Sequence, residues 1–265
     1  MARKRLAWLY NDSLLTEGQR DRCDVVLVSP RNPLNIGAAA RAMANFGFAR
    51  LAVVAPYEPH WRESRSAVGA PELLENAKST ECLAEAVAGC TLVAGTGTLT
   101  YRKPEQRVVR LPDLAPFVRS EIERGGRVAL VFGPEKRGLT REDLSYCHLL
   151  VEIPTDARQP SMNLGQAVAV CLYELAARAG AAEEGAYSPI EAAENRSERT
   201  AASEKLELLA GIVERAMVAA GYSPNAMRKA NRHDLRLLLR RLEPTERDAR
   251  RILGLFRRIL WRMEQ

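Results

Sequence analysis

The chain has 265 residues, of which 46% are hydrophobic and 27% charged. These fractions are ordinary for a folded globular protein and exclude wholesale disorder. At roughly 100–200 residues per domain, the length predicts one or two domains. No apolar run approaches the roughly 18 residues of a membrane span, and the basic N-terminus lacks the apolar stretch of a signal peptide.

The cysteines and histidines argue against disulfide and metal sites. The five cysteines are scattered and form no CxxC pair, and the chain holds only three histidines. Unpaired, scattered cysteines are typical of the reducing cytoplasm, where we expect this protein to act. We also expect no metal requirement.

The net charge of +6 is unevenly distributed along the chain. Residues 1–178 hold 23 Lys and Arg against 20 Asp and Glu, whereas residues 201–265 hold 14 against 8. A basic C-terminal segment favours an anionic partner, nucleic acid before membrane. The alternative, that these arginines only solvate exposed helices, stays open on charge alone.

Short apolar runs alternate with helical patterns through residue 178. Because the runs are continuously apolar, they are typical of strands buried on both faces of a parallel sheet. The expected strands are residues 24–29, 50–55, 91–96, 127–133 and 148–154. The expected helices are residues 35–46, 72–88, 113–124, 140–146 and 163–178. This alternation predicts an α/β domain with a parallel sheet over residues 1–178, with its core at about 22–178.

The C-terminal third of the sequence has a different pattern. Residues 179–200 are acidic and rich in small residues, which predicts a linker. Residues 201–265 have a purely helical pattern and are expected to form a small basic extension. Ser223-Pro224 predicts the start of a second helix there and Glu243-Pro244 the end of a third, before a last helix.

The first candidate site follows the strand at 24–29, where ligands bind in open α/β sheets. Asn35 is expected to cap a helix rich in small residues, and Gly37 with its neighbouring alanines allows close approach of another backbone. Arg41 follows within the same helix, where it could point toward an anion or a sugar. The simpler alternative is that Asn35 is only a cap and Arg41 only a surface charge.

Two further candidate sites follow later strands. Residues 131–140 come close to a phosphate-binding P-loop, but Leu139 stands where the essential lysine is needed, so an NTPase is rejected. Glu135 adds a carboxylate to this loop. In the third segment, Ser161 and Asn163 precede a helix, which either side chain could simply cap. No GxSxG elbow surrounds Ser161, so a serine hydrolase is not indicated.

In this order and spacing the three motifs resemble one known family. The motifs are 32-NPLNIGAAAR-41, 131-VFGPEKRGLT-140 and 160-PSMNLGQAVAV-170. They resemble the SPOUT class of RNA methyltransferases, in the SpoU branch that methylates ribose 2′-hydroxyls, over about residues 22–178. The basic helical extension makes the chain most similar to the TrmJ type. That type methylates cytidine or uridine at nucleotide 32 of the tRNA anticodon loop.

The resemblance implies a C-terminal trefoil knot that binds S-adenosyl-L-methionine and a homodimer whose subunits share the active site. The implied catalytic residues are Arg41, Asn35, Ser161 and Asn163, with Glu135 supporting the motif loops. The implied cofactor-binding residues are Thr96, Gly97, Gly133, Glu135, Ile153, Ser161, Met162 and Leu164.

The same resemblance assigns tRNA binding to the extension. The densest basic cluster there consists of Arg228, Lys229, Arg232, Arg236, Arg240 and Arg241. These arginines could instead solvate a helical bundle beside the dimer interface. Two other functions also stay open: methylation of ribosomal RNA, and RNA binding without catalysis.

Overall fold

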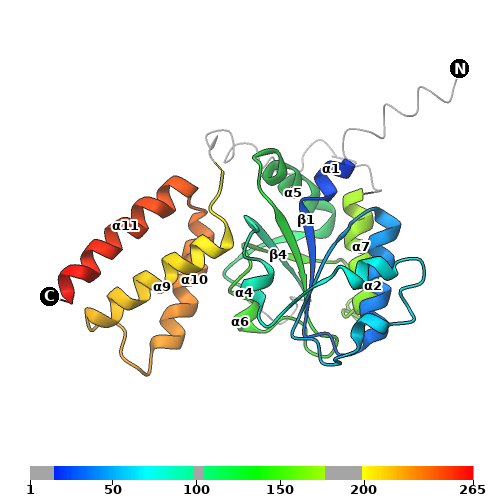
Figure 1. The fold of residues 1–265 in the computed structure, drawn as a ribbon, viewed down its shortest axis with the longest axis horizontal. Helices are drawn as coiled ribbons and strands as arrows, with labels where there is room; N and C mark the ends of the chain where they lie inside the picture. The colour runs from blue at the N-terminus through cyan, green and yellow to red at the C-terminus, as the bar shows by residue number, and fades with distance from the viewer. Residues whose placement is uncertain (1–14, 98–103, 177–198, 265) are drawn as a thin grey trace, which may run out of the picture.

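The structure is a computed structural model that describes residues 15–97, 104–176 and 199–264. Its centre is a seven-stranded sheet in which every strand pair is parallel (Figure 1). The sheet order is β3-β2-β1-β6-β4-β7-β5. The strands are β1 (Cys23–Val28), β2 (Arg50–Val54), β3 (Lys78–Thr80), β4 (Leu92–Thr96), β5 (Arg107–Arg110), β6 (Val128–Phe132) and β7 (Leu149–Glu152). The predicted α/β class with a parallel sheet is confirmed.

The central strands are buried on both faces, as their continuous apolar runs predict. In β6, Val128, Leu130 and Phe132 point into one hydrophobic core. Ala129 and Val131, the alternate residues, point into a second core on the opposite face. The sheet therefore separates two cores, each of which needs its own covering helices.

Those helices form two layers (Figure 1). One face is covered mainly by α2 (Pro33–Phe46), α5 (Leu114–Glu123) and α7 (Leu164–Ala176). The other face is covered by the shorter helices α4 (Leu83–Ala86) and α6 (Arg141–Leu144). Two more short α-helices, α1 (Glu17–Arg20) and α3 (Pro71–Glu75), and two 3-10 helices, η2 (Trp61–Glu63) and η3 (Leu111–Asp113), complete the described elements of this part of the chain.

The prediction of one helix over residues 72–88 is wrong. The structure divides this range into α3, β3 and α4, because Lys78–Thr80 pairs with Ala52–Val54 of β2. Sheet pairing overrides the local helical pattern there. Strand β5 was not expected either, since an edge strand bounded by Arg107 and Arg110 lacks a long apolar run.

Helices α2 and α7 pack closely because their contact points carry small residues. A Cβ atom added to Gly165 of α7 would lie 2.7 Å from the Cβ of Ala38 in α2. Helix α2 also packs closely on the loop before α3: a Cβ added to Gly37 would lie 2.8 Å from the backbone nitrogen of Ala67. The predicted close approach at this small-residue helix is confirmed.

Residues 199–264 contain α9 (Ser203–Ala219), α10 (Arg228–Leu242) and α11 (Glu246–Met263). The expected second and third helices are one helix, α10, since no Gly or Pro interrupts the chain between Pro224 and Pro244. Helix α9 lies beside α4 (Figure 1), where the amide of Ser203 donates to the carbonyl of Cys90 at 2.9 Å. Most of the predicted linker at 179–200 lies outside the described residues.

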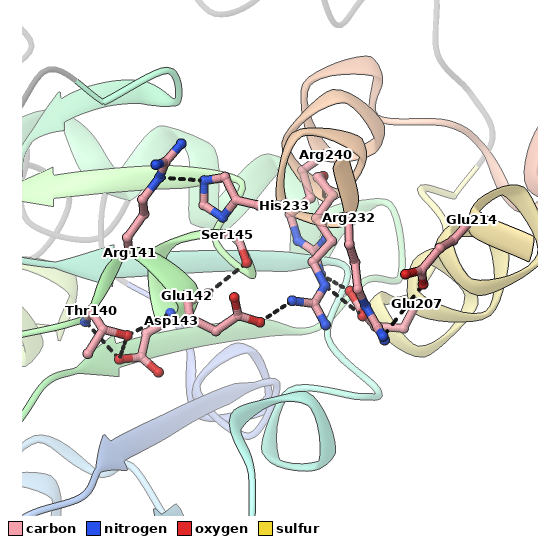
Figure 2. A network of polar contacts seen from close by, with 11 residues as sticks. Thr140, Arg141, Glu142, Asp143, Ser145, Glu207, Glu214, Arg232, His233 and Arg240 are labelled. Carbon is pink, nitrogen blue, oxygen red and sulfur yellow. Dashed lines mark hydrogen bonds and ion pairs between the residues drawn. The ribbon is translucent and has the colours of Figure 1, made fainter. Parts of the chain in front are cut away.

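A polar network, here called the clamp, joins α10 to α6 (Figure 2). Arg236 pairs with Glu142 of α6 and, at 3.0 Å, with Glu207 of α9. Arg240 pairs with the other oxygen of Glu207 at 3.0 Å. Both guanidinium groups also lie over the ring of Tyr146, at 4.2 and 5.4 Å from its centroid.

The clamp requires a correction to the expected RNA-binding residues. The side chains of Arg236 and Arg240 are only 5% and 1% exposed, and their charges are already paired with carboxylates. A phosphate could not reach them without breaking these pairs. Arg236 and Arg240 therefore hold α10 against α6, α9 and Tyr146, and the expectation that these two arginines bind RNA is wrong.

We expect Arg236→Ala to lower the free energy of unfolding by about 1–3 kcal/mol, because it removes a buried guanidinium that pairs with Glu142 and Glu207, of which Glu207 keeps a second partner, Arg240. Chemical denaturation followed by circular dichroism measures this loss. The control is Arg228→Ala on the same helix, an exposed arginine whose removal should cost less than about 0.5 kcal/mol. Equal losses for both variants would contradict the structural role of the clamp.

Candidate functional site

A cavity of about 280 Å³ opens at the carboxyl ends of β4, β6 and β7, the edge where parallel sheets bind ligands. Three chain segments line it: residues 96–97, 132–139 and 153–167. The eight residues expected to bind a cofactor all lie on its wall: Thr96, Gly97, Gly133, Glu135, Ile153, Ser161, Met162 and Leu164. Motifs that are far apart in the sequence thus meet in one cavity.

The loop after β6 turns tightly to shape this cavity. A Cβ added to Gly133 would lie 2.3 Å from the backbone of Gly138 and Leu139, so only glycine allows the two ends of the loop to meet. Gly138 itself has a φ of +64°, in the left-handed region that favours glycine. Leu139 is buried at 1% exposure, in agreement with a core role and not that of a P-loop lysine.

Glu135 connects this loop to the loop after β1. Its carboxylate accepts hydrogen bonds from the backbone amides of Arg31 at 3.0 Å and Asn32 at 3.2 Å. It also accepts a hydrogen bond from Nδ2 of Asn35 at 2.8 Å. We call this set the Glu135 brace.

The brace favours the ionised carboxylate. Partial burial raises the pKa of Glu135, but the hydrogen bond from Asn35 and those from backbone amides outweigh burial and hold the pKa below its usual 4.5. Glu135 is therefore a carboxylate at neutral pH that accepts three hydrogen bonds from the loop after β1 and from Asn35. These contacts suit a structural support better than a catalytic base.

Asn163 extends the brace to the third segment. Its Nδ2 donates to Oδ1 of Asn35 at 2.9 Å, while its own Oδ1 accepts from the amides of Gly165 and Gln166. It therefore caps α7, as one of the alternatives predicted. The matching prediction for Asn35 is wrong: α2 begins at Pro33 and is capped by Asn32, which frees Asn35 to join Glu135 and Asn163.

Arg41 and Ser161 are less constrained. Arg41 is exposed on α2, and Ser161 is exposed at the cavity wall. Within ranges 15–97, 104–176 and 199–264, no hydrogen bond or ion pair joins Arg41 to Asn35, Ser161 or Asn163. The structure thus brings together Asn35, Glu135 and Asn163 and leaves the Arg41 guanidinium outside their network.

Two features of this edge were not predicted from the sequence. The backbone amides of Arg31 and Asn32 contribute to the brace, and backbone groups carry no side-chain signal. Ser29 and Ala55, at the ends of the neighbouring strands β1 and β2, have φ values of 45° and 41°. Such strain in residues other than glycine is uncommon and concentrates at functional sites. Both residues precede a proline, the one local sign of an unusual turn.

Four of the predicted RNA-binding residues remain accessible on α10. Arg228, Lys229, Arg232 and Arg241 are exposed. Arg232 forms an ion pair with Glu214 at 3.5 Å, but its side chain is still 47% exposed. An exposed ion pair is weak enough to exchange partners.

Among the residues that the structure describes, no group of three or more His, Cys, Asp or Glu side chains could hold a metal ion. No helix in the same part of the chain is long and apolar enough to cross a membrane.

Known proteins with similar sequences belong to the family that the three motifs resemble. Residues 22–173 match the SpoU rRNA Methylase family. The chain is 37% identical over 206 residues to the tRNA (cytidine/uridine/adenosine-2′-O-)-methyltransferase TrmJ of Pseudomonas aeruginosa, covering 76% of this chain and 79% of that protein. It is 32% identical to the tRNA (cytidine/uridine-2′-O-)-methyltransferase TrmJ of Citrobacter koseri, covering 91% and 96%.

The fold agrees as well. The crystal structure of TrmJ from Z. mobilis ZM4 superposes with a TM-score of 0.74 at 29% identity, covering 89% of this chain and 98% of that one. The chain belongs to the SpoU rRNA methylase family and, within it, to the TrmJ methyltransferases.

Proposed function

We propose that this protein is an S-adenosyl-L-methionine-dependent tRNA methyltransferase that modifies the ribose 2′-hydroxyl of cytidine or uridine at nucleotide 32 of the anticodon loop. The observation that carries the proposal is the single cavity formed by three motif segments beside Asn35 and Asn163. The names of the TrmJ relatives support the choice of tRNA, cytidine and uridine.

The cavity suits S-adenosyl-L-methionine chemically. Its wall combines the apolar side chains of Ile153, Met162 and Leu164 with glycine backbone at 97, 133 and 138. Apolar surface with a few exposed backbone donors and acceptors is the usual environment for a nucleoside ligand. When bound, this cofactor supplies a methyl group that its sulfonium already activates, so the transfer needs no metal.

The protein must then position and activate the ribose hydroxyl, which is a poor nucleophile at neutral pH. We assign charge stabilisation to Arg41, because a guanidinium stays protonated and cannot readily act as a base. Asn35 and Asn163, already joined at 2.9 Å, orient the RNA or Arg41, and Ser161 contributes from the cavity wall. Glu135 holds these segments in place.

Three further features belong to the proposal. The segment that carries the third motif passes through a loop to form a trefoil knot, and two copies of the chain form a homodimer with a shared active site; both rest on family membership. A cytoplasmic location suits the free thiols of Cys23, Cys90, Cys147 and Cys171, which are buried without disulfides.

The extension is proposed to bind tRNA through Arg228, Lys229, Arg232 and Arg241. Their exposure on one helix that is fixed to the catalytic domain supports this role. Ribosomal RNA is the alternative substrate, as the name of the matching family allows. A protein that binds RNA without catalysis is the second alternative.

The reaction can be tested on unmodified tRNA incubated with S-adenosyl-L-methionine, followed by mass spectrometry of RNA fragments. We expect a new 2′-O-methyl group on the nucleotide at position 32. Arg41→Ala should lower the rate by 100-fold or more, in the range of about 10²–10³ for loss of one charge-stabilising group, while cofactor affinity stays unchanged. The control is Arg22→Ala. Arg22 directly precedes β1, so it lies at the amino ends of the strands, away from the cavity at their carboxyl ends.

Methylation of ribosomal RNA instead of tRNA would replace the proposed substrate. Cofactor binding without methylation of either RNA would favour the non-catalytic alternative. Full activity of Arg41→Ala would remove Arg41 from the mechanism and leave the substrate assignment intact.

We expect Glu135→Gln to be less stable than the wild type at neutral pH, because an amide cannot replace both carboxylate oxygens in the brace. Since the folded-state pKa of Glu135 lies below 4.5, its contribution is complete above that pH and is lost as the pH falls through the folded-state value. Thermal unfolding from pH 3 to 7 should therefore show the two proteins converging in acid. The exposed control Glu105→Gln should follow the wild type, and a pH-independent gap for Glu135→Gln would contradict the ionised brace.

We expect Arg228→Gln combined with Lys229→Gln to weaken tRNA binding and to reduce its salt dependence. Each lost phosphate contact removes about 0.7–0.9 from the slope of log K against log salt, so the slope should fall by about 1–2. Fluorescence anisotropy at several salt concentrations measures it. The control, Arg22→Gln combined with Arg50→Gln, removes the same charge at the amino ends of β1 and β2. It should leave the slope unchanged. If the pairs behave alike, the extension does not bind tRNA through α10.

A further inference from the structure

An exposed tyrosine lies on the loop after β2, near the candidate active site. Tyr57 is 69% exposed, and it is not among the residues that line the cofactor cavity. The guanidinium of Arg31 lies over its ring, 5.4 Å from the centroid. An exposed aromatic ring held beside a guanidinium offers a flat surface on which a planar ligand can stack.

The backbone fixes this pair relative to the brace. The amide of Tyr57 donates to the carbonyl of Pro30 at 3.2 Å, and the amide of Ser29 donates to Val54 at 2.8 Å. Arg31, which follows Pro30 in the chain, donates its backbone amide to the carboxylate of Glu135 at 3.0 Å. Tyr57 is therefore connected to the proposed active site through short, hydrogen-bonded loops that do not depend on its side chain.

The chemistry of the pair suits an unpaired nucleobase. Single-stranded RNA is recognised by stacking its bases on aromatic rings and on arginine planes. Arg31 covers part of one ring face, and the high exposure of Tyr57 leaves the rest of the ring open. A phosphate is a poorer match, because Glu58 adjoins Tyr57 and brings a negative charge to the same loop.

We propose that Tyr57 and Arg31 form a stacking platform for an unpaired base of the RNA loop whose ribose is methylated. This inference rests on the proposed function and adds a residue that selects and orients the substrate. Tyr57 is a positioning residue: it holds the RNA loop so that the ribose reaches the cavity. Because stacking is not ionic, its contribution should change little with salt, unlike that of α10.

Steady-state methylation of tRNA by Tyr57→Ala, Tyr57→Leu and Tyr57→Phe tests the platform. We expect kcat/KM for tRNA to fall about 10-fold or more for Ala and Leu, the size of one base–aromatic stack, and to stay near wild type for Phe. Affinity for S-adenosyl-L-methionine and the unfolding midpoint should be unchanged in all three, because the side chain is exposed and lies outside the cavity.

Leucine is the decisive comparison, because it keeps apolar surface but offers no aromatic face. If Tyr57→Leu behaves as wild type, stacking is not the contact, and if Tyr57→Ala also does, the platform does not exist. Either result leaves the proposed function standing, since wild-type methylation of tRNA is measured in the same assay.

If the protein does not methylate tRNA, a second measurement can still test base stacking on Tyr57 separately from the proposed enzymatic function. A short single-stranded RNA with the anticodon-loop sequence and 2-aminopurine in place of one base reports stacking directly as a loss of fluorescence. We expect wild type and Tyr57→Phe to quench it, and Tyr57→Ala and Tyr57→Leu to quench it far less. No quenching by the wild type at any labelled position would overturn the platform, whatever the enzyme methylates.

Discussion

The carboxylate of Glu135 is the contact on which the site depends. It comes from the loop after β6, accepts two backbone amides from the loop after β1, and reaches α7 through Asn35 and Asn163. Parallel strands bring these loops to one edge of the sheet but do not fix their spacing. One ionised side chain with several donors does so, because charge-assisted hydrogen bonds are stronger than neutral ones.

A second ionic contact places the extension relative to that site. The clamp binds α10 to α6, and α6 begins directly after the loop that carries Glu135 (Figure 2). The Thr140–Asp143 capping box starts α6, so the loop ends at a fixed point. The basic surface of α10 and the cofactor cavity are thus joined through two short, well-anchored segments, which suits an enzyme that must hold a large RNA while it modifies one nucleotide.

The apolar runs were sufficient to predict the buried strands, because they are a local signal, whereas the cavity-wall residues were expected from the resemblance of three motifs to a known family. Sequence-based prediction failed where the local structure or burial depends on contacts with residues far away in the chain. Residues 78–80 become a strand only through pairing with β2, and Arg236 and Arg240 are buried only because Glu142 and Glu207 meet them in space. The prediction that Asn35 caps α2 was wrong for a local reason. Proline is favoured in the first turn of a helix, so Pro33 is the first residue of α2 and Asn32 is its cap.

We propose that three motifs far apart in the sequence form one cofactor site, whose segments Glu135 holds together. Hydrogen–deuterium exchange with and without S-adenosyl-L-methionine tests this arrangement. We expect slower exchange in residues 96–97, 132–139 and 153–167 together, and loss of this joint protection in Glu135→Gln at the same cofactor concentration. Protection confined to one of these segments, or located elsewhere on the protein, would contradict it.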